Sequence, residues 1–299
     1  MAWLQLSVAV DRDNADRVSE LLSGRGAVAV TLSAAGEEQL LEPLPGQQPL
    51  WHQVRLDALI DPGADLNALR SVLQPAGARL LDVTFVAEDE WQQRWRAHAV
   101  RACFGGRLWL LPRDEPFEAP PRGSGAAPAV LRLDPGLAFG SGSHPTTRLC
   151  LAGLAALPLD GVRVLDYGCG SGILALAACL LGARKVVAVD HDPQALVATR
   201  DNAAYNGIDD RQLEILLPEA LDAADPDRFD VVVANILANP LTVLAPRLTA
   251  LTAEGGRLLL SGLLDGQDRM IRAAYPAVVF ETPVHEDDWI RLDGRRGSC

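Results

Sequence analysis

Two carboxylates and a glycine-rich segment stand close together in the middle of the chain. Asp166 ends an apolar stretch, and residues 168–172 follow it with glycine at every second position. Such a segment can turn tightly and approach a ligand closely, because glycine tolerates backbone angles that other residues avoid. Asp190 ends the next apolar stretch, 22 residues after Gly168. The combination predicts a site for a ligand that contains a nucleoside.

Asp190 has the position of a residue that binds ribose. The second strand of a doubly wound sheet ends beside the first strand, so the Asp190 carboxylate is expected next to the glycine loop. It could accept hydrogen bonds from both ribose hydroxyls, each worth roughly 1.5–3 kcal/mol. The alternative is that Asp190 only caps the helix that begins around Asp192 and Pro193. We favour the ribose role because loop, strand and carboxylate agree.

The glycine spacing separates two classes of nucleotide-binding enzyme. Nicotinamide-dependent dehydrogenases usually carry G-x-G-x-x-G and an acidic residue about 20 positions later. Residues 168–172, with Gly168 and Gly170 leading, have G-x-G-x-G instead. This spacing argues against a loop that binds a pyrophosphate, and such a loop can pack against an amino acid and a nucleoside instead.

Asn235 ends a further apolar stretch, residues 229–235. If this strand ends beside a methyl donor, the amide oxygen of Asn235 can accept a hydrogen bond from an amine and align its lone pair for displacement. Asparagine after a strand is also a common turn residue. The residue alone leaves both interpretations open.

A loop rich in glycine and proline, residues 133–147, precedes the expected cofactor strand. It ends in His144, Pro145, Thr146 and Thr147, and helical periodicity follows. We interpret the loop as a cover over the cofactor site. The two threonines could instead cap the helix. The five histidines form no pair with metal-ligand spacing, so we expect no metal.

The first 86 residues alternate between strand and helix patterns in the order β-α-β-β-α-β. Alternating apolar positions indicate strands around residues 4–10, 28–32, 54–58 and 81–85, and helical spacing is found in 14–23 and 66–73. This order is typical of a ferredoxin-like domain. A helix over residues 88–100, with Trp91 and Trp95 on one face, is expected to join it to the next domain.

The second part of the chain alternates strands and helices. Strands are predicted at residues 163–167, 185–190, 213–216, 230–235 and 257–261, with two more near the C-terminus. Such alternation indicates a mostly parallel, doubly wound sheet of seven strands with helices on both faces. We therefore predict three parts: a ferredoxin-like domain (1–86), a linker helix (87–103) and a catalytic domain (104–299).

Composition restricts the partners. The chain has 299 residues, 48% of them hydrophobic, and a formal charge of −12. The negative charge argues against nucleic-acid binding, which needs a basic face, and suits a cationic partner. Five cysteines without paired spacing, no signal-peptide pattern and no long apolar run predict a monomeric cytoplasmic protein.

Residues 166–190 resemble the cofactor site of class I methyltransferases. The resemblance implies that loop 168–172 lies under the methionine and adenosine of S-adenosylmethionine. It also implies that Asp166 lies near the methionine amine, although Asp166 could instead only cap a helix.

The whole chain resembles a narrower family, the bacterial methyltransferases of large-subunit ribosomal protein eleven. The segments that carry this resemblance are residues 42–46, 91–95, 134–147, 166–172, 190–193, 201–202, 235–238 and 260–262. The resemblance implies cofactor contacts by Thr147, Gly168, Asp190 and Asn235. It also implies substrate recognition by the N-terminal domain, and trimethylation of lysine side chains and of the N-terminal amine of the ribosomal protein.

Two departures and two alternatives accompany the resemblance. Ser141 and Ser143 replace the usual threonines but keep the hydroxyl, and no proline follows Trp95. A release-factor glutamine methyltransferase would carry Asn-Pro-Pro-Tyr where this chain continues from Asn235 with Ile236. A ribosome-binding module that has lost its activity would not need an intact cofactor pattern.

Overall fold

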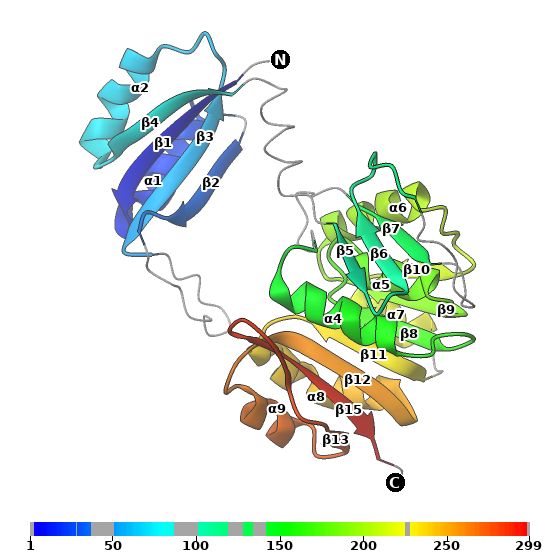
Figure 1. The fold of residues 1–299 in the computed structure, drawn as a ribbon. Helices are drawn as coiled ribbons and strands as arrows, with labels where there is room; N and C mark the ends of the chain where they lie inside the picture. Colours follow the sequence, from blue (N-terminus) through cyan, green and yellow to red (C-terminus); the bar gives the residue numbers. More distant parts are fainter. Residues whose placement is uncertain are drawn as a thin grey trace. The chain divides into compact units, whose positions relative to one another are not determined.

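The computed structural model describes residues 3–27, 29–36, 51–86, 101–118, 128–133, 142–224 and 228–297. Contacts divide the chain into two compact units, Met1–Trp95 and Arg96–Cys299 (Figure 1). The predictions for residues 42–46, for helix 88–100 and for loop residues 134–141 fall outside the described residues. The predicted linker helix and the exact domain boundaries therefore stay predictions.

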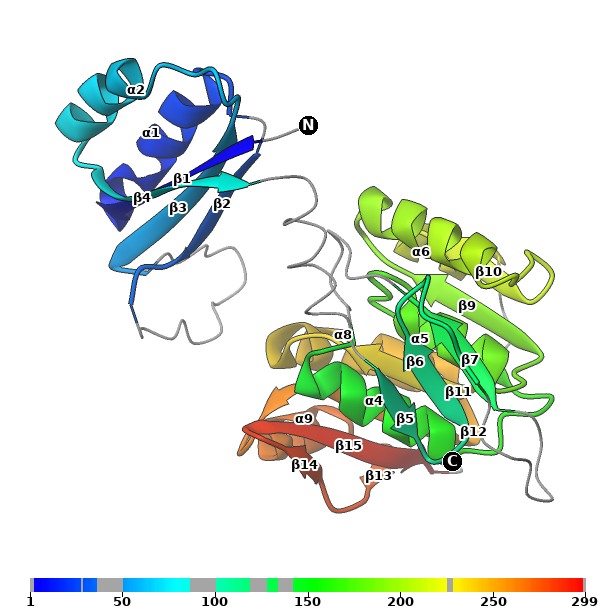
Figure 2. The ribbon, with the colours of Figure 1, turned by 45° about the horizontal axis from the view of Figure 1, so that its top comes forward.

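The first unit is an antiparallel sheet with two helices on one face (Figure 2). Its elements are β1 (Trp3–Asp11), α1 (Arg12–Ser23), β2 (Ala29–Ala34), β3 (Gln53–Ile60), α2 (Leu66–Leu73), η1 (Gln74–Ala76) and β4 (Arg79–Val86). The strand order β2-β3-β1-β4 confirms the ferredoxin-like prediction. Alternating side chains of β1, such as Leu6 and Val8, are buried together with Val18 and Leu22 of α1.

The second unit contains the large sheet. Its strands are β8 (Arg163–Tyr167), β9 (Lys185–Val189), β10 (Leu213–Leu216), β11 (Phe229–Asn235), β12 (Thr252–Leu264), β13 (Val278–Phe280), β14 (Val284–Glu286) and β15 (Trp289–Arg296). The order is β10-β9-β8-β11-β12-β15-β13; the first five strands are parallel, and β15 is antiparallel to both of its neighbours. The doubly wound prediction is confirmed. The short strand β14 pairs with β15 alone and is one more than the seven strands predicted.

Helices cover both faces of this sheet, as Figures 1 and 2 show. They are α4 (Pro145–Ala156), α5 (Ile173–Leu180), α6 (Pro193–Tyr205), α7 (Pro218–Ala224), α8 (Ala238–Leu251) and α9 (Asp268–Ala274). Successive strand residues face opposite sides. Val164 therefore belongs to the core formed with α4, α5 and α6, whereas Leu165 belongs to the core formed with α7, α8 and α9.

A second, smaller sheet packs against the α4 and α5 side of the unit. It consists of β5 (Ala102–Phe104), β6 (Leu108–Leu111) and β7 (Ala129–Arg132), in that order. Leu110 and Leu131 bury their side chains in the core that contains α4 and α5. The sequence analysis did not predict this sheet, because its strands are short and do not alternate with helices as the strands of the large sheet do. None of the helices described here is apolar and long enough to cross a membrane.

Candidate functional site

The sequence-predicted site residues meet at one edge of the large sheet. Strands β8, β9, β11 and β12 are parallel, so their carboxyl ends lie on the same side. Tyr167 pairs with Val189 at the ends of β8 and β9, and Asn235 pairs with Ser261 across β11 and β12. The glycine loop and Asp190 therefore leave the sheet beside each other, and Asn235 ends on the other side of β8.

The glycine loop needs glycine for its backbone and for its neighbours. Gly168, Gly170 and Gly172 have φ angles of 83°, 55° and 80°, which side chains with a Cβ rarely adopt. A Cβ on Gly172 would lie 2.6 Å from Cγ2 of Thr199. The backbone N–H of Gly168 donates to the carbonyl of Val189 at 2.7 Å and fastens the loop to β9. The loop is thus a tight turn held against the second strand.

Asp190 connects the loop to the start of α6. Its Oδ2 accepts from the backbone N–H of Gly170 at 2.9 Å, and its Oδ1 accepts from that of Asp192 at 3.0 Å. The cap of α6 is Asp192, which accepts from the N–H of Gln194 at 2.8 Å. The capping alternative for Asp190 was therefore wrong. Asp190 is 8% exposed, and its carboxylate lies between the glycine loop and the start of α6.

Asp166 lies below the loop with no exposed surface. Its Oδ2 accepts from the backbone N–H of Ala175 at 2.9 Å, so the carboxylate satisfies one N–H in the first turn of α5, whose N-cap residue is Gly172. Its Oδ1 has no hydrogen-bond partner among the described residues. Burial raises the pKa of Asp166 to about 7; the Ala175 N–H opposes this shift, and the charge of Asp190 adds to it.

Asn235 contacts the residue that the sequence placed on the upstream loop. Its Nδ2 donates to Oγ1 of Thr147 in the first turn of α4 at 3.4 Å. The two residues are 88 positions apart, and Thr147 is 3% exposed. With the amide nitrogen directed at Thr147, the amide oxygen of Asn235 takes no part in this contact. The pair joins α4 to β11 at the edge where the glycine loop ends β8.

The residue after Asn235 is held between two glycines. Ile236 Cγ2 fills the place that a Cβ on Gly168 would take, and the Ile236 carbonyl fills the place of a Cβ on Gly262. Both glycines have positive φ angles. Gly262 is a residue whose role the sequence analysis missed. Its motif contributed to the family resemblance, but only the structure shows that the Ile236 backbone leaves no room for a side chain there.

The N-terminus of α4 is capped by His144. Its Nδ1 accepts from the backbone N–H of Thr146 at 3.4 Å and lies 2.8 Å from the Thr146 hydroxyl. The imidazole packs edge-on against Trp289, and burial lowers the pKa of His144. The threonines are therefore not the cap. Thr147 is left to contact Asn235.

A buried arginine fastens α4 to the sheet, and no sequence pattern revealed it. Arg291 of β15 is 7% exposed and donates to the carbonyl of Leu149 in α4. It also makes two parallel hydrogen bonds to Asp293, at 2.8 and 2.7 Å. A Cβ on Gly153 would lie 2.8 Å from the guanidinium, so the glycine makes room for it. This contact sets the height of α4 above β12 and β15.

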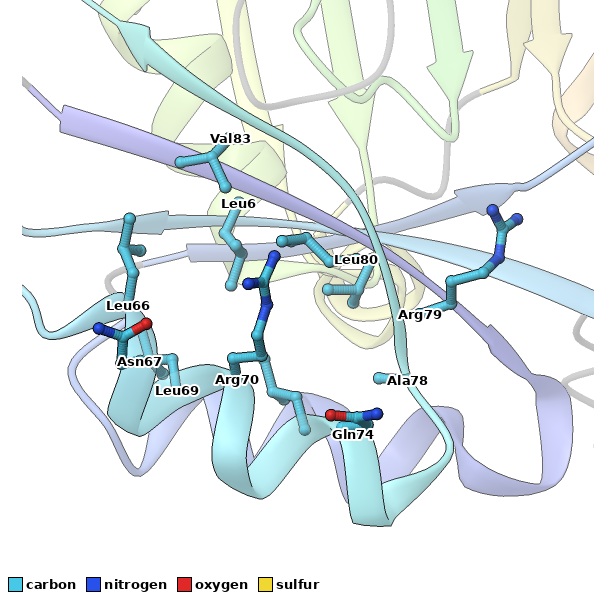
Figure 3. A pocket seen from close by; sticks show the side chains of 12 residues that line it. Leu6, Leu66, Asn67, Leu69, Arg70, Gln74, Ala78, Arg79, Leu80 and Val83 are labelled. Atoms are coloured by element: carbon cyan, nitrogen blue, oxygen red, sulfur yellow. The ribbon is translucent and has the colours of Figure 1, made fainter.

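A cavity of about 670 Å³ lies in the first unit, away from all of these residues (Figure 3). It is formed by α2, η1, β1 and β4. Arg70 extends from α2 toward the strands, and Leu69, Leu80 and Val83 provide apolar walls. No predicted cofactor residue lines it, so we place the chemistry at the edge of the large sheet on the strand ends and their hydrogen bonds.

The strand order of the large sheet, with antiparallel β15 inserted between β12 and β13, and the glycine loop beside Asp190 define a class I methyltransferase. A family model described as ribosomal protein L11 methyltransferase (PrmA) matches residues 2–297. The chain belongs to this family and is a methyltransferase.

Individual relatives agree with the family model. A protein of Marinobacter nauticus called ribosomal protein L11 methyltransferase is 46% identical over 99% of both chains. One of Methylococcus capsulatus with the same name is 45% identical over 98% of this chain and 99% of its own. The crystal structure of a ribosomal protein L11 methylase from Lactobacillus delbrueckii subsp. bulgaricus is 34% identical, has a TM-score of 0.55, and covers 64% of this chain and 96% of its own.

Proposed function

We propose that this methyltransferase transfers methyl groups from S-adenosylmethionine to amines of ribosomal protein L11. Its targets would be lysine side chains and the N-terminal amine, and trimethylated nitrogen would be the end product. The observation that carries the proposal is the Asn235–Thr147 pair beside Gly168. The relatives named for L11 methylation support the substrate.

The residues at the sheet edge fit the cofactor. The loop with Gly168 and Gly170 presents backbone without side chains, and Asp190 offers a carboxylate for ribose hydroxyls. Thr147 and Asn235 would border the methyl-donating end. When bound, S-adenosylmethionine supplies a methyl group activated by its sulfonium.

Asp166 would act from below the loop. Its unpartnered Oδ1 is an acceptor suited to the methionine amine, although its burial requires the loop to open or a water molecule to bridge the two groups. Its bond to Ala175 would meanwhile hold the start of α5 under the loop. Both roles need the same carboxylate, one oxygen for each.

Asn235 would orient the target amine. A free lysine has a pKa near 10.4, so roughly one in a thousand is neutral at pH 7.5, a deficit of about 4 kcal/mol. A positive sulfonium nearby disfavours an ammonium and lowers that pKa. In the first two transfers the amide oxygen of Asn235 would accept a hydrogen bond from the neutral amine and direct its lone pair at the methyl carbon. The dimethylated amine has no N–H left, so the third transfer would depend on the shape of the site alone. Water would take the released proton.

The ferredoxin-like unit would recognise the protein substrate. The enzyme would act as a monomer in the cytoplasm. Family membership supports this proposal over a glutamine-directed release-factor enzyme, because Asn235 is followed by Ile236 and not by proline.

The test is incubation of the purified chain with labelled S-adenosylmethionine and purified ribosomal protein L11, followed by mass mapping of peptides. We expect mass increases of three methyl groups on lysine and on the N-terminal residue. Unmodified L11 in the presence of bound cofactor would contradict the substrate. Methylation of glutamine in a release factor would favour the alternative.

A further inference from the structure

Helix α6 donates two side-chain hydrogen bonds to the glycine loop. Oγ1 of Thr199 donates to the carbonyl of Gly170 at 3.0 Å, and Nδ2 of Asn202 donates to the carbonyl of Ser171 at 2.9 Å. Thr199 is fully buried, and Asn202 is 9% exposed. The spacing of the glycines predicts neither contact, but both acceptors belong to the loop.

These two bonds fix consecutive peptide planes. The peptide group is planar, so holding the carbonyl of Gly170 or Ser171 also fixes the direction of the N–H in the same plane. Glycine residues on both sides of Ser171 would otherwise give the loop many conformations. Ordering them in advance lowers the entropy that a ligand must overcome on binding.

The direction of the Asn202 amide is set by an arginine. The guanidinium of Arg113 donates to Oδ1 of Asn202 at 2.8 Å. A guanidinium can only donate, and the Ser171 carbonyl can only accept. The amide must therefore turn its oxygen toward Arg113 and its nitrogen toward the loop.

Arg113 is itself held in place. Its guanidinium lies over the ring of Tyr205, 4.5 Å from the ring centroid. Its carbonyl accepts from the Tyr205 hydroxyl at 3.0 Å and from the guanidinium of Arg132 at 2.9 Å. The end of β6, α6 and the glycine loop are thus linked through one amide.

We propose that Asn202 is a positioning residue for the cofactor, and that Arg113 acts through it by fixing its amide. The inference rests on the proposed S-adenosylmethionine site. Asn202 does not touch the cofactor itself; it presents the loop in the conformation that binds it.

The first test is Asn202→Asp, which keeps the shape and the acceptor for Arg113 but replaces the donor to Ser171 with an oxygen. We expect the Kd for S-adenosylmethionine, measured by calorimetry, to rise at least tenfold. The matched control is Asn206→Asp, one turn later on the same chain. Asn206 donates to the carbonyls of Arg132 and Asn202 and accepts from the N–H of Arg132, and none of these hydrogen bonds reaches the loop. Its Kd should stay within twofold of the unaltered protein. Equal affinity of Asn202→Asp and the unaltered protein overturns the proposal.

The role of Arg113 is tested with a double-mutant cycle. Arg113→Met keeps the apolar stem and removes the donor. It should weaken cofactor binding severalfold in the unaltered chain and have no further effect in Asn202→Leu, which has no amide for Arg113 to orient. If the two substitutions raised the Kd by independent factors that multiply in the double variant, Arg113 would not act through Asn202.

A measurement without ligand separates this inference from the proposed function. Amide hydrogen exchange at Gly170 and Gly172 should accelerate in Asn202→Asp and not in Asn206→Asp. If Asn202→Asp does not fold, Asn202→Leu replaces it, since it also removes the donor to Ser171 and places no charge in the buried site. Unchanged exchange overturns the inference. Absence of cofactor binding by the unaltered chain, with exchange behaving as expected, refutes only the proposed function.

Discussion

Asn235 is the residue on which the proposed chemistry depends most. We predict that Asn235→Ala lowers kcat about 100-fold, because the amine loses the acceptor that aligns its lone pair. Cofactor binding should change little, since Asp190 and the glycine loop are intact. Steady-state kinetics with L11 and calorimetry with S-adenosylmethionine measure the two effects separately.

The control for this prediction is a variant expected to impair cofactor binding and not turnover. Asp190→Ala removes the carboxylate at the ribose position and the acceptor for the Gly170 N–H. It should weaken cofactor binding much more than it lowers kcat at saturating cofactor. A normal turnover of Asn235→Ala, or an unchanged cofactor affinity of Asp190→Ala, would contradict the corresponding role.

Asp166 predicts a pH dependence of stability. Its pKa is about 7 in the folded protein and near 3.8 otherwise, so the folded state holds the proton more tightly. Stability is therefore lost as the pH rises from about 4 to about 7. Asp166→Asn keeps the shape of the side chain and cannot ionise. Its free energy of unfolding should therefore exceed that of the unaltered protein by an amount that grows with pH over this range, on the order of 1–4 kcal/mol.

Thermal unfolding of both proteins between pH 4.5 and 8 measures this difference without cofactor. Other titrating groups are shared and cancel in the comparison. We expect the Tm of Asp166→Asn to rise relative to the unaltered protein as the pH increases. A constant difference would mean that Asp166 ionises normally in the folded chain.

At the scale of elements, β11 is positioned by the ends of its two neighbours. Ile236 fits against Gly168 at the end of β8 and against Gly262 in β12. A side chain on Gly262 must displace the backbone of Ile236, next to Asn235, whereas a side chain on Gly168 must displace the Ile236 side chain. The position of Asn235, the proposed catalytic residue, therefore depends on glycines at the end of β8 and in β12.

We predict that Gly262→Ala lowers kcat roughly 10- to 100-fold, because displacements of about 1 Å have effects of this size. Gly266→Ala is the matched control. Gly266 also has a positive φ, 87°, but a Cβ there would meet nothing within 4 Å. Both variants carry backbone strain, and only Gly262→Ala carries the clash. Equal activity of the two would contradict the positioning role of Gly262.

At the scale of the whole molecule, every candidate cofactor residue lies in the second unit, Arg96–Cys299. We predict that S-adenosylmethionine at 100 times its Kd stabilises this unit by about 2.7 kcal/mol and leaves the first unit unchanged. Hydrogen exchange resolved by segment tests this, with β8 and β9 compared against β1 and β3. Equal protection of both units would contradict the placement of the site.

Much of the fold follows from local patterns. The alternation of Leu4, Leu6 and Val8 predicts a strand with one buried face, and the same alternation runs through the other strands of the first sheet. The order of strands and helices then leaves few arrangements, because connections are short and crossovers right-handed. Strands β5, β6 and β7 were not predicted, because they are short and lack the alternation with helices that marks the equally short β10.

The sequence by itself determined which residues could bind a nucleoside: the glycines of 168–172 and Asp190 belong to one strand-turn-helix-strand unit, so their proximity is fixed by short connections. Only the tertiary structure decided the rest. Thr147 meets Asn235 across 88 residues, and Asn202 reaches the carbonyl of Ser171 from a different helix. Such contacts depend on how the helices pack on the sheet. Residue spacing within a single segment does not predict this packing.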